Sequence, residues 1–211
     1  MIERLGIIPA AGKAERWGGM PKELIPIGNE TLLDRTVLAM ENGKADAIML
    51  ITNTEKAPLH IQHLKNKPIL YKIQQGKKDL WSAICESFSI GASMNYFAMP
   101  DTYFNTDIFG KMSRLDFNIG YFETREPERF GVISEYEIID KQPTGGVQKA
   151  WGVLSWSYKV AEFWTLFMDQ IETHTQAFNM AISQFGFSMT KLDYYHDVAN
   201  YEYYKRLING I

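Results

Sequence analysis

The stretch Leu5-Gly6-Ile7-Ile8-Pro9-Ala10-Ala11-Gly12 sets the organisation of this chain. It opens as a short apolar run and ends in small residues, a pattern typical of a strand that is buried on both faces and leaves its sheet at Pro9. Similar apolar runs follow at 47–52, 69–74 and 94–99. The stretches 31–42, 55–66 and 79–88 lie between them and carry the apolar stripe of helices. This alternation predicts an α/β fold with a mixed, mainly parallel central sheet and helices on both sides.

The chain after residue 113 has a different pattern. Segments 118–124, 131–140 and 149–155 read as strands joined by loops, and 157–168 and 173–184 read as helices. A last strand at 188–194 precedes a helix from about 201 to 209. Because no linker, low-complexity tract or repeat divides the sequence, we expect a single domain over residues 1–211 with a more antiparallel second half.

The composition excludes several classes of protein. Hydrophobic residues make up 45% of the 211 residues, so the chain is not disordered. The 22 basic and 25 acidic side chains give a net charge of −3, which offers no basic field for a nucleic acid. The single cysteine, Cys85, excludes an internal disulfide and is expected in the core. Glu3, Arg4 and Pro9 interrupt the amino-terminal apolar run, so we expect no signal peptide, no membrane span and a cytoplasmic protein.

Small residues at the end of the first strand predict a ligand site. Ala10, Ala11 and Gly12 let an anion approach the backbone closely, and the carboxyl edge of an open α/β sheet is where ligands bind. Arg16 and Lys22 bring two cations to the same place. The segment is neither a P-loop nor a G-x-G-x-x-G motif. The alternative is an ordinary strand-to-helix turn whose charges face solvent.

This segment resembles a known family. Pro9-Ala10-Ala11-Gly12, then Arg16, then Pro21-Lys22-Glu23-Leu24-Ile25-Pro26-Ile27-Gly28 is similar to the signature of the sugar-phosphate nucleotidyltransferases, of the glucose-1-phosphate thymidylyltransferase and uridylyltransferase type. Those enzymes join a nucleoside triphosphate to a sugar 1-phosphate and release pyrophosphate. The resemblance implies their Rossmann-like fold, a triphosphate held by residues 10–12, and catalytic roles for Arg16 and Lys22.

Later segments extend the resemblance to the base and a metal. Gln75-Gly76 is similar to the base-reading loop, and the Gln75 amide suits a pyrimidine edge, although Asp79 stands where the family usually has glycine. Asp101 and Asp197 resemble the two carboxylates that hold Mg²⁺ together with phosphate oxygens. Each aspartate, taken alone, could equally be a turn residue or a helix cap.

Two further segments are similar to the family's sugar-phosphate site. They are Pro127-Glu128-Arg129-Phe130-Gly131-Val132 and Ile138-Ile139-Asp140-Lys141-Gln142-Pro143. The resemblance implies that Gly131 lets the sugar lie against the backbone, Asp140 accepts from sugar hydroxyls and Lys141 pairs with the phosphate. The alternative is a hairpin with a charged tip. Ala14, Glu15 and Asp140 depart from the family pattern, which leaves reduced or altered activity open.

The residues therefore favour an in-line displacement at the α-phosphorus, in which the sugar phosphate attacks without a general base. Two other interpretations stay open: a cytidylyltransferase for choline phosphate or methylerythritol phosphate, and a nucleotide-binding protein without catalysis. The sequence does not fix the sugar or the base. His60 and His63 indicate a surface face of a helix rather than a zinc site. Aromatic residues from 151 onward indicate core packing or a contact between copies in a homo-oligomer.

Overall fold

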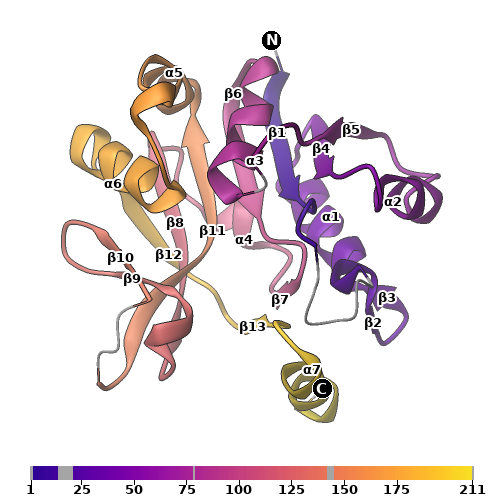
Figure 1. Cartoon of the computed structure of the whole chain (residues 1–211). Helices are drawn as coiled ribbons and strands as arrows, with labels where there is room; N and C mark the ends of the chain where they lie inside the picture. The colour runs from indigo at the N-terminus through magenta and orange to yellow at the C-terminus, as the bar shows by residue number, and fades with distance from the viewer. Residues whose placement is uncertain (1, 14–20, 78, 142–144, 211) are drawn as a thin grey trace.

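One nine-stranded sheet runs through the computed structural model, which describes residues 2–13, 21–77, 79–141 and 145–210 (Figure 1). The strand order is β10-β9-β11-β6-β1-β4-β5, with β8 also paired to β11 and β12 paired to β8. The mixed sheet with flanking helices confirms the predicted α/β class.

The first half of the chain builds the parallel part of the sheet. Its strands are β1 (Ile2–Pro9), β4 (Ala47–Thr52), β5 (Ile69–Ile73) and β6 (Ala92–Ala98). Its main helices are α1 (Leu32–Asn42), α2 (Ala57–His63) and α3 (Leu80–Glu86), the last followed by η3 (Ser87–Ser89). β1 pairs in parallel with β4 on one side and β6 on the other, and β5 pairs in parallel with β4. The carboxyl ends of four parallel strands therefore lie at one edge of the sheet, with β1 between β4 and β6.

The two faces of β1 pack against different helices. Leu5 and Ile7 belong to the hydrophobic cluster that includes residues of α3, α5 (Tyr158–Leu166) and α6 (His174–Phe185). Ile8 belongs to the cluster of α1 and α4 (Ile108–Lys111) on the other face. A Cβ at Gly6 would lie 2.8 Å from Met40 Cγ, so the glycine lets α1 approach the sheet closely. Burial on both faces explains why the sequence of β1 is a continuous apolar run from residue 5 onward.

The second half adds antiparallel strands. They are β8 (Phe117–Thr124), β9 (Gly131–Ile133), β10 (Ile138–Asp140) and β11 (Gln148–Ser157), with η5 (Met168–Gln170) and β12 (Ser188–Lys191) following later. β11 pairs antiparallel with β6, β8 and β9, whereas β12 pairs in parallel with β8. The strand predicted over 131–140 divides into the hairpin of β9 and β10, whose turn is closed by Ser134 N donating to Glu137 O over 2.8 Å.

Several short elements were not predicted. They are η2 (Lys22–Leu24), β2 (Pro26–Ile27), β3 (Glu30–Thr31), β7 (Thr102–Phe104), α4 and η4 (Pro127–Arg129). The strand expected at 188–194 stops at residue 191, and β13 (Tyr195–Asp197) instead pairs antiparallel with β7. β13 leads into α7 (Tyr201–Gly210), which lies at the opposite end of Figure 1 from the amino terminus.

Most aromatic residues between 151 and 167 pack inside the molecule. Trp156 and Trp164 are fully buried, and their ring centroids lie 5.2 Å apart at a steep angle. Cys85 is half-buried beside this cluster, and burial, with smaller effects of Asp79 and Glu86, raises the pKa of its thiol to about 12. These residues confirm the core-packing interpretation.

Among the described residues, no helix combines the length and apolar character needed to cross a membrane.

Candidate functional site

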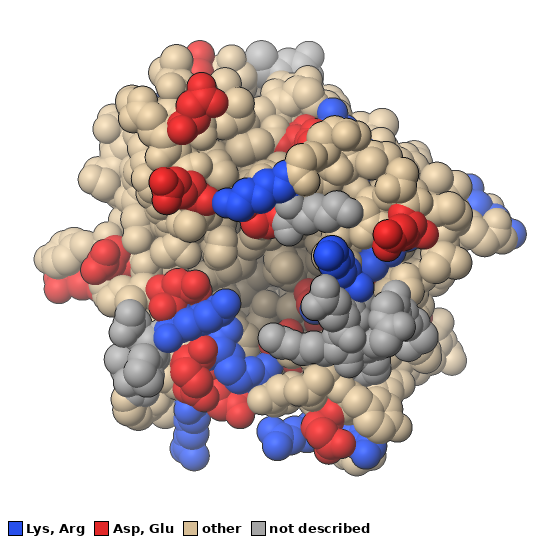
Figure 2. Space-filling model, in the orientation of Figure 1, with Lys and Arg blue, Asp and Glu red and all other residues tan. Residues whose placement is uncertain are grey.

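A cavity opens at the carboxyl edge of the parallel strands. Ala10 follows β1, Asn53 follows β4 and Asp101 lies three residues beyond Ala98, the last residue of β6. Figure 2 shows this face hollowed near its middle, with basic and acidic side chains around the hollow. The cavity is lined by Pro9, Ala10, Ala11, Gly12, Lys22, Glu23, Lys56, Gln74, Asp79, Leu80, Ala83, Met99, Pro100 and Asp101. Segments that are far apart in the sequence therefore meet here, as the rule for open α/β sheets predicts.

The small-residue loop is fixed by hydrogen bonds to its carbonyl oxygens. Ala10 N donates to Ile51 O over 2.7 Å and so extends the pairing of β1 with β4. Asn53 Nδ2 donates to Ala11 O over 2.8 Å, and Lys56 Nζ donates to Ala10 O over 3.3 Å. Because a trans peptide holds its C=O and N–H on opposite sides, the N–H groups of Ala11 and Gly12 point away from Asn53 and Lys56. This is the backbone arrangement that an anion-binding loop requires.

Lys22 and Asp101 lie together in the cavity. Lys22 begins η2, and its Nζ forms an ion pair with Asp101 Oδ2. Asp101 is buried, whereas the Lys22 side chain is 27% exposed. Lys22 is therefore within reach of a ligand while a buried carboxylate holds it in place.

Asp197 lies beside Asp101 although the two are distant in the chain. In the pairing of β13 with β7, Asp197 stands opposite Thr102, and Val198 N donates to Asp101 O over 3.1 Å. Burial and the neighbouring Asp101 raise the pKa of the Asp197 carboxyl. Arg129 opposes this shift, because its Nη2 lies 2.6 Å from Asp197 Oδ2. The predicted pair of carboxylates is thus brought together, and each one already has a cationic partner.

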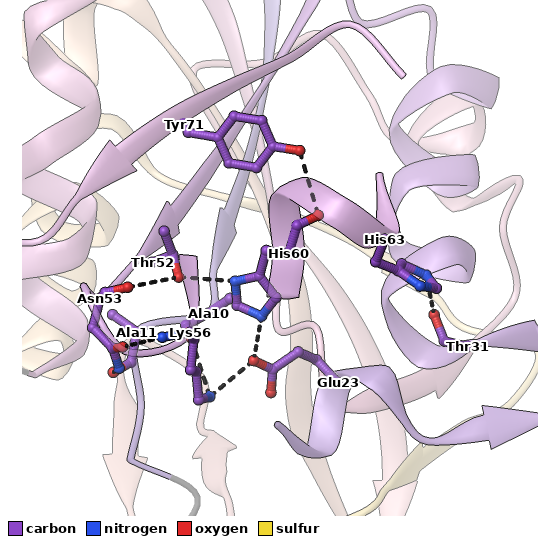
Figure 3. Close-up of polar contacts among 10 residues, drawn as sticks. All are labelled: Ala10, Ala11, Glu23, Thr31, Thr52, Asn53, Lys56, His60, His63 and Tyr71. Atoms are coloured by element: carbon purple, nitrogen blue, oxygen red, sulfur yellow. Dashed lines mark hydrogen bonds and ion pairs between the residues drawn. The ribbon is translucent and has the colours of Figure 1, made fainter. Parts of the chain in front are cut away.

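A buried charged cluster below the cavity was missed by sequence reasoning (Figure 3). Glu23 is 1% exposed, and its Oε1 lies 2.8 Å from both Lys56 Nζ and His60 Nε2. His60 is fully buried, so the expectation that His60 and His63 form a surface face was wrong for His60. The signal was available, since Ala57, His60 and Leu64 have helical spacing and share the buried side of α2. His63 instead contacts Asp34 at 3.0 Å in a half-exposed position.

In the predicted base-reading loop, Gln74 rather than Gln75 faces the main cavity. Gln74 lines the cavity, and its Nε2 donates to Asp79 O over 2.9 Å. Gln75 is exposed and lies in a neighbouring hollow with Asp79 and Trp81. Gly76 has a φ of 65°, which is the left-handed backbone that glycine permits.

Asp79 has a structural role as the N-cap of α3. Its Oδ1 accepts from Ser82 N over 2.8 Å, and Lys77 Nζ lies 2.8 Å from its other oxygen. Burial opposes ionisation of Asp79, but the bonds from Lys77 and Ser82 outweigh it and lower the pKa. A charged carboxylate therefore stands at the rim of the cavity where the family usually has glycine.

The predicted sugar-phosphate residues lie at the open end of the β9–β10 hairpin. Asp140 stands opposite Gly131, and Lys141 N donates to Phe130 O over 3.0 Å. This pairing places Asp140 and Lys141 at the end of the hairpin away from its turn at 134–137. Both residues are exposed. A Cβ at Gly131 would lie 2.4 Å from Trp151 Nε1, so this glycine is required by the packing of an indole ring.

Five positions named by the sequence argument lie outside the described residues: Ala14, Glu15, Arg16, Gln142 and Pro143.

Comparison with known proteins agrees with this geometry. Residues 6–104 match the family model of the MobA-like NTP transferase domain. The match runs from within β1 to the end of β7, and so contains Gly12, Lys22 and Asp101 but not Asp197. No curated protein matches the chain.

Two solved structures share the fold over nearly the whole chain. One is a Bacillus anthracis protein described as a candidate glucose-1-phosphate thymidylyltransferase, solved in complex with a sucrose. It has 18% identity and a TM-score of 0.82, and the alignment covers 98% of this chain and 94% of that one. The other is HddC from Yersinia pseudotuberculosis, with 18% identity, a TM-score of 0.73, and coverage of 100% and 99%. The likeness to these two structures confirms the predicted fold.

Proposed function

We propose that this protein is a nucleotidyltransferase that joins a nucleoside triphosphate to a sugar 1-phosphate and releases pyrophosphate. One observation carries the proposal: a small-residue loop, Lys22 and Asp101 line a single cavity, and Asp197 lies directly beside Asp101. The match of residues 6–104 to an NTP transferase domain supports the triphosphate as one substrate.

The triphosphate would bind at the loop that follows β1. The N–H groups of Ala11 and Gly12 point away from α2 and can donate to phosphate oxygens. Lys22 would turn from Asp101 to a phosphate, and Arg16 would add a second cation by its place in the motif. Gln74 and Gln75 are the side chains near which the base would lie, with Gly76 shaping the loop between them and α3.

The two carboxylates fit a magnesium ion. Asp101, immediately before β7, and Asp197, at the end of its partner strand β13, present hard oxygen ligands, which Mg²⁺ takes together with phosphate oxygens. The described residues contain no group of three or more His, Cys, Asp or Glu side chains that could hold a metal, so phosphate and water oxygens would complete the shell. When bound, Mg²⁺ would supply positive charge to the phosphates during transfer.

The chemistry would be an in-line displacement. An oxygen of the acceptor phosphate attacks the α-phosphorus, the bond to the β-phosphate oxygen breaks, and pyrophosphate leaves. The acceptor phosphate is already ionised, so the protein has to supply alignment and charge rather than a base. Asp140 and Lys141 would hold the sugar hydroxyls and the acceptor phosphate at the open end of the β9–β10 hairpin, where Gly131 begins β9.

The direct test is pyrophosphate release from the protein with each nucleoside triphosphate, Mg²⁺ and a panel of phosphate acceptors. We expect release with a sugar 1-phosphate, and we expect Asp101→Asn to abolish it while triphosphate binding persists. Binding of a triphosphate without turnover on any acceptor would show a nucleotide-binding protein and refute the enzyme.

One observation leaves open a second class of acceptor, a phosphate that is not carried by a sugar. Gly131 is explained by its contact with Trp151, so this part of the motif supports a sugar less strongly than its pattern implied. The same panel therefore includes choline phosphate and methylerythritol phosphate. Release with one of these alone, and with CTP, would establish a cytidylyltransferase for a non-sugar phosphate.

A further inference from the structure

The buried cluster of Glu23, Lys56 and His60 lies between the two elements that the proposed function assigns to the triphosphate. Glu23 directly follows Lys22 in η2, and Lys56 precedes α2. Both Glu23 and Lys56 also line the cavity. A carboxylate and an ammonium this deeply buried are costly unless they are paired, and breaking one partner of such a pair leaves an uncompensated charge.

The charged side chains of the cluster join different segments (Figure 3). Glu23 Oε1 contacts Lys56 Nζ and His60 Nε2, each at 2.8 Å. His60 Nδ1 lies 2.8 Å from Thr52 Oγ1 at the end of β4. Lys56 Nζ also donates to Ala10 O, so one ammonium connects the Pro-Lys segment to the loop after β1.

The neighbouring Asn53 reinforces this connection. Its side chain donates to Ala11 O and accepts from Lys56 N over 2.9 Å. The carbonyls of Ala10 and Ala11 are both held toward the Asn53–Lys56 segment, which orients the following N–H groups to the other side. The position of Lys22 and the direction of the loop N–H groups therefore depend on one set of buried contacts.

We propose that Glu23 is a positioning residue which, through Lys56 and His60, fixes Lys22 and the loop of residues 10–12 at the separation that a triphosphate requires. This inference rests on the proposed function. In this role Glu23 does not act by touching the substrate, because its Oε1 is bound to Lys56 and His60. Its carboxylate sets the geometry of groups that do, and a displacement of about 1 Å in such groups can lower a rate by about 100-fold.

The test separates positioning from stability with three variants. Glu23→Gln leaves Lys56 buried without its counter-charge, so both stability and kcat/KM for the triphosphate should fall, the latter by about 100-fold. Glu23→Gln combined with Lys56→Met removes both charges, so Tm should recover while kcat/KM stays low. Glu41→Gln is the matched control, because Glu41 pairs with Lys67 at the surface at 2.6 Å. It should change kcat/KM less than about twofold.

The decisive result is the double variant. Recovery of kcat/KM together with Tm would show that Glu23 serves stability alone and would overturn the inference. Loss of kcat/KM with recovered Tm supports it.

Amide hydrogen exchange gives a readout that does not need turnover. In the double variant, exchange at the hydrogen-bonded amides of Ala10, Leu24 and Ile25 should accelerate, whereas exchange at Ala181 in α6 should not. Unchanged exchange at the first three amides would overturn the inference. A parent protein that turns over no acceptor would refute the proposed function, and exchange would then still decide whether Glu23 fixes the two segments.

Discussion

Glu23 makes the stability of the protein depend on pH in a definite direction. Burial raises the pKa of its carboxyl, but hydrogen bonds from His60 and Lys56 and the charge of Lys56 outweigh burial, so the net pKa lies below the usual 4.5. A carboxyl with a lowered folded-state pKa stabilises the protein above its unfolded pKa and loses that contribution as pH falls through the folded pKa. The charge on Glu23 therefore stabilises the fold at neutral pH.

We expect the free energy of unfolding of the parent to exceed that of Glu23→Gln, with the largest difference at about pH 7. The difference should narrow as the pH falls below about 4.5. Urea unfolding of both proteins across this range measures the gap. A gap that stays constant down to the acid limit of folding would show that the charge of Glu23 is not its source.

Gly131 offers a second test at single-residue scale. Gly131→Ala should destabilise the protein by about 1–3 kcal/mol, because the added Cβ would meet Trp151 Nε1 at 2.4 Å. Gly91→Ala is the control, since no atom lies within 4 Å of a Cβ built there. Thermal unfolding of the two variants makes the comparison. If Gly131→Ala is as stable as the parent and only weakens sugar-phosphate binding, the glycine serves the ligand.

At the scale of one element, the residue that caps α3 also lines the cavity. Asp79 caps α3 and stands at the cavity rim, where its negative charge opposes a triphosphate. Asp79→Gly should lower KM for the triphosphate, because it removes that charge and frees Lys77, while the lost cap costs only a few tenths of a kcal/mol. Steady-state kinetics measures the change. Thr31→Gly removes the cap of α1 outside the cavity and should leave KM unchanged, and an equal KM in both variants would contradict the prediction.

The elements differ in how well a sequence predicts them. β1, β4 and β6 were predicted because strands buried on both faces need unbroken apolar runs. β5 was predicted from its apolar residues although it lies at the edge of the sheet and is only partly buried. β7 and β13 were missed because three residues are too few to show a period. The structure places Gln74 in the lining of the main cavity and Gln75 in the neighbouring hollow, an arrangement that the sequence beyond the end of β5 does not determine. The base-reading role of Gln75 stays a prediction. The resemblance predicted that Asp101 and Asp197 lie together. The structure shows that the pairing of strands β7 and β13 brings them there.

At the scale of the whole molecule, β11 joins the two halves. It pairs with β6 of the parallel part and with β8 and β9 of the antiparallel part. We therefore expect one cooperative unfolding transition, with an enthalpy of about 150 kcal/mol near 60 °C for 211 residues. Scanning calorimetry measures it. Two resolved transitions, or a van't Hoff enthalpy well below the calorimetric one, would show that the halves unfold separately.

The late position of Asp197 also has a consequence during synthesis on the ribosome. A chain is made from its amino terminus, and the segments that supply the loop after β1, Lys22 and Asp101 emerge early and can begin to fold. Asp197 is added long afterwards, and β13 then has to pair with β7, with which it forms a two-stranded sheet of its own. Under the proposed function, a nascent chain would therefore form the triphosphate side of the site well before it has both carboxylates. The order of translation would then delay catalytic competence until nearly all the described residues are in place.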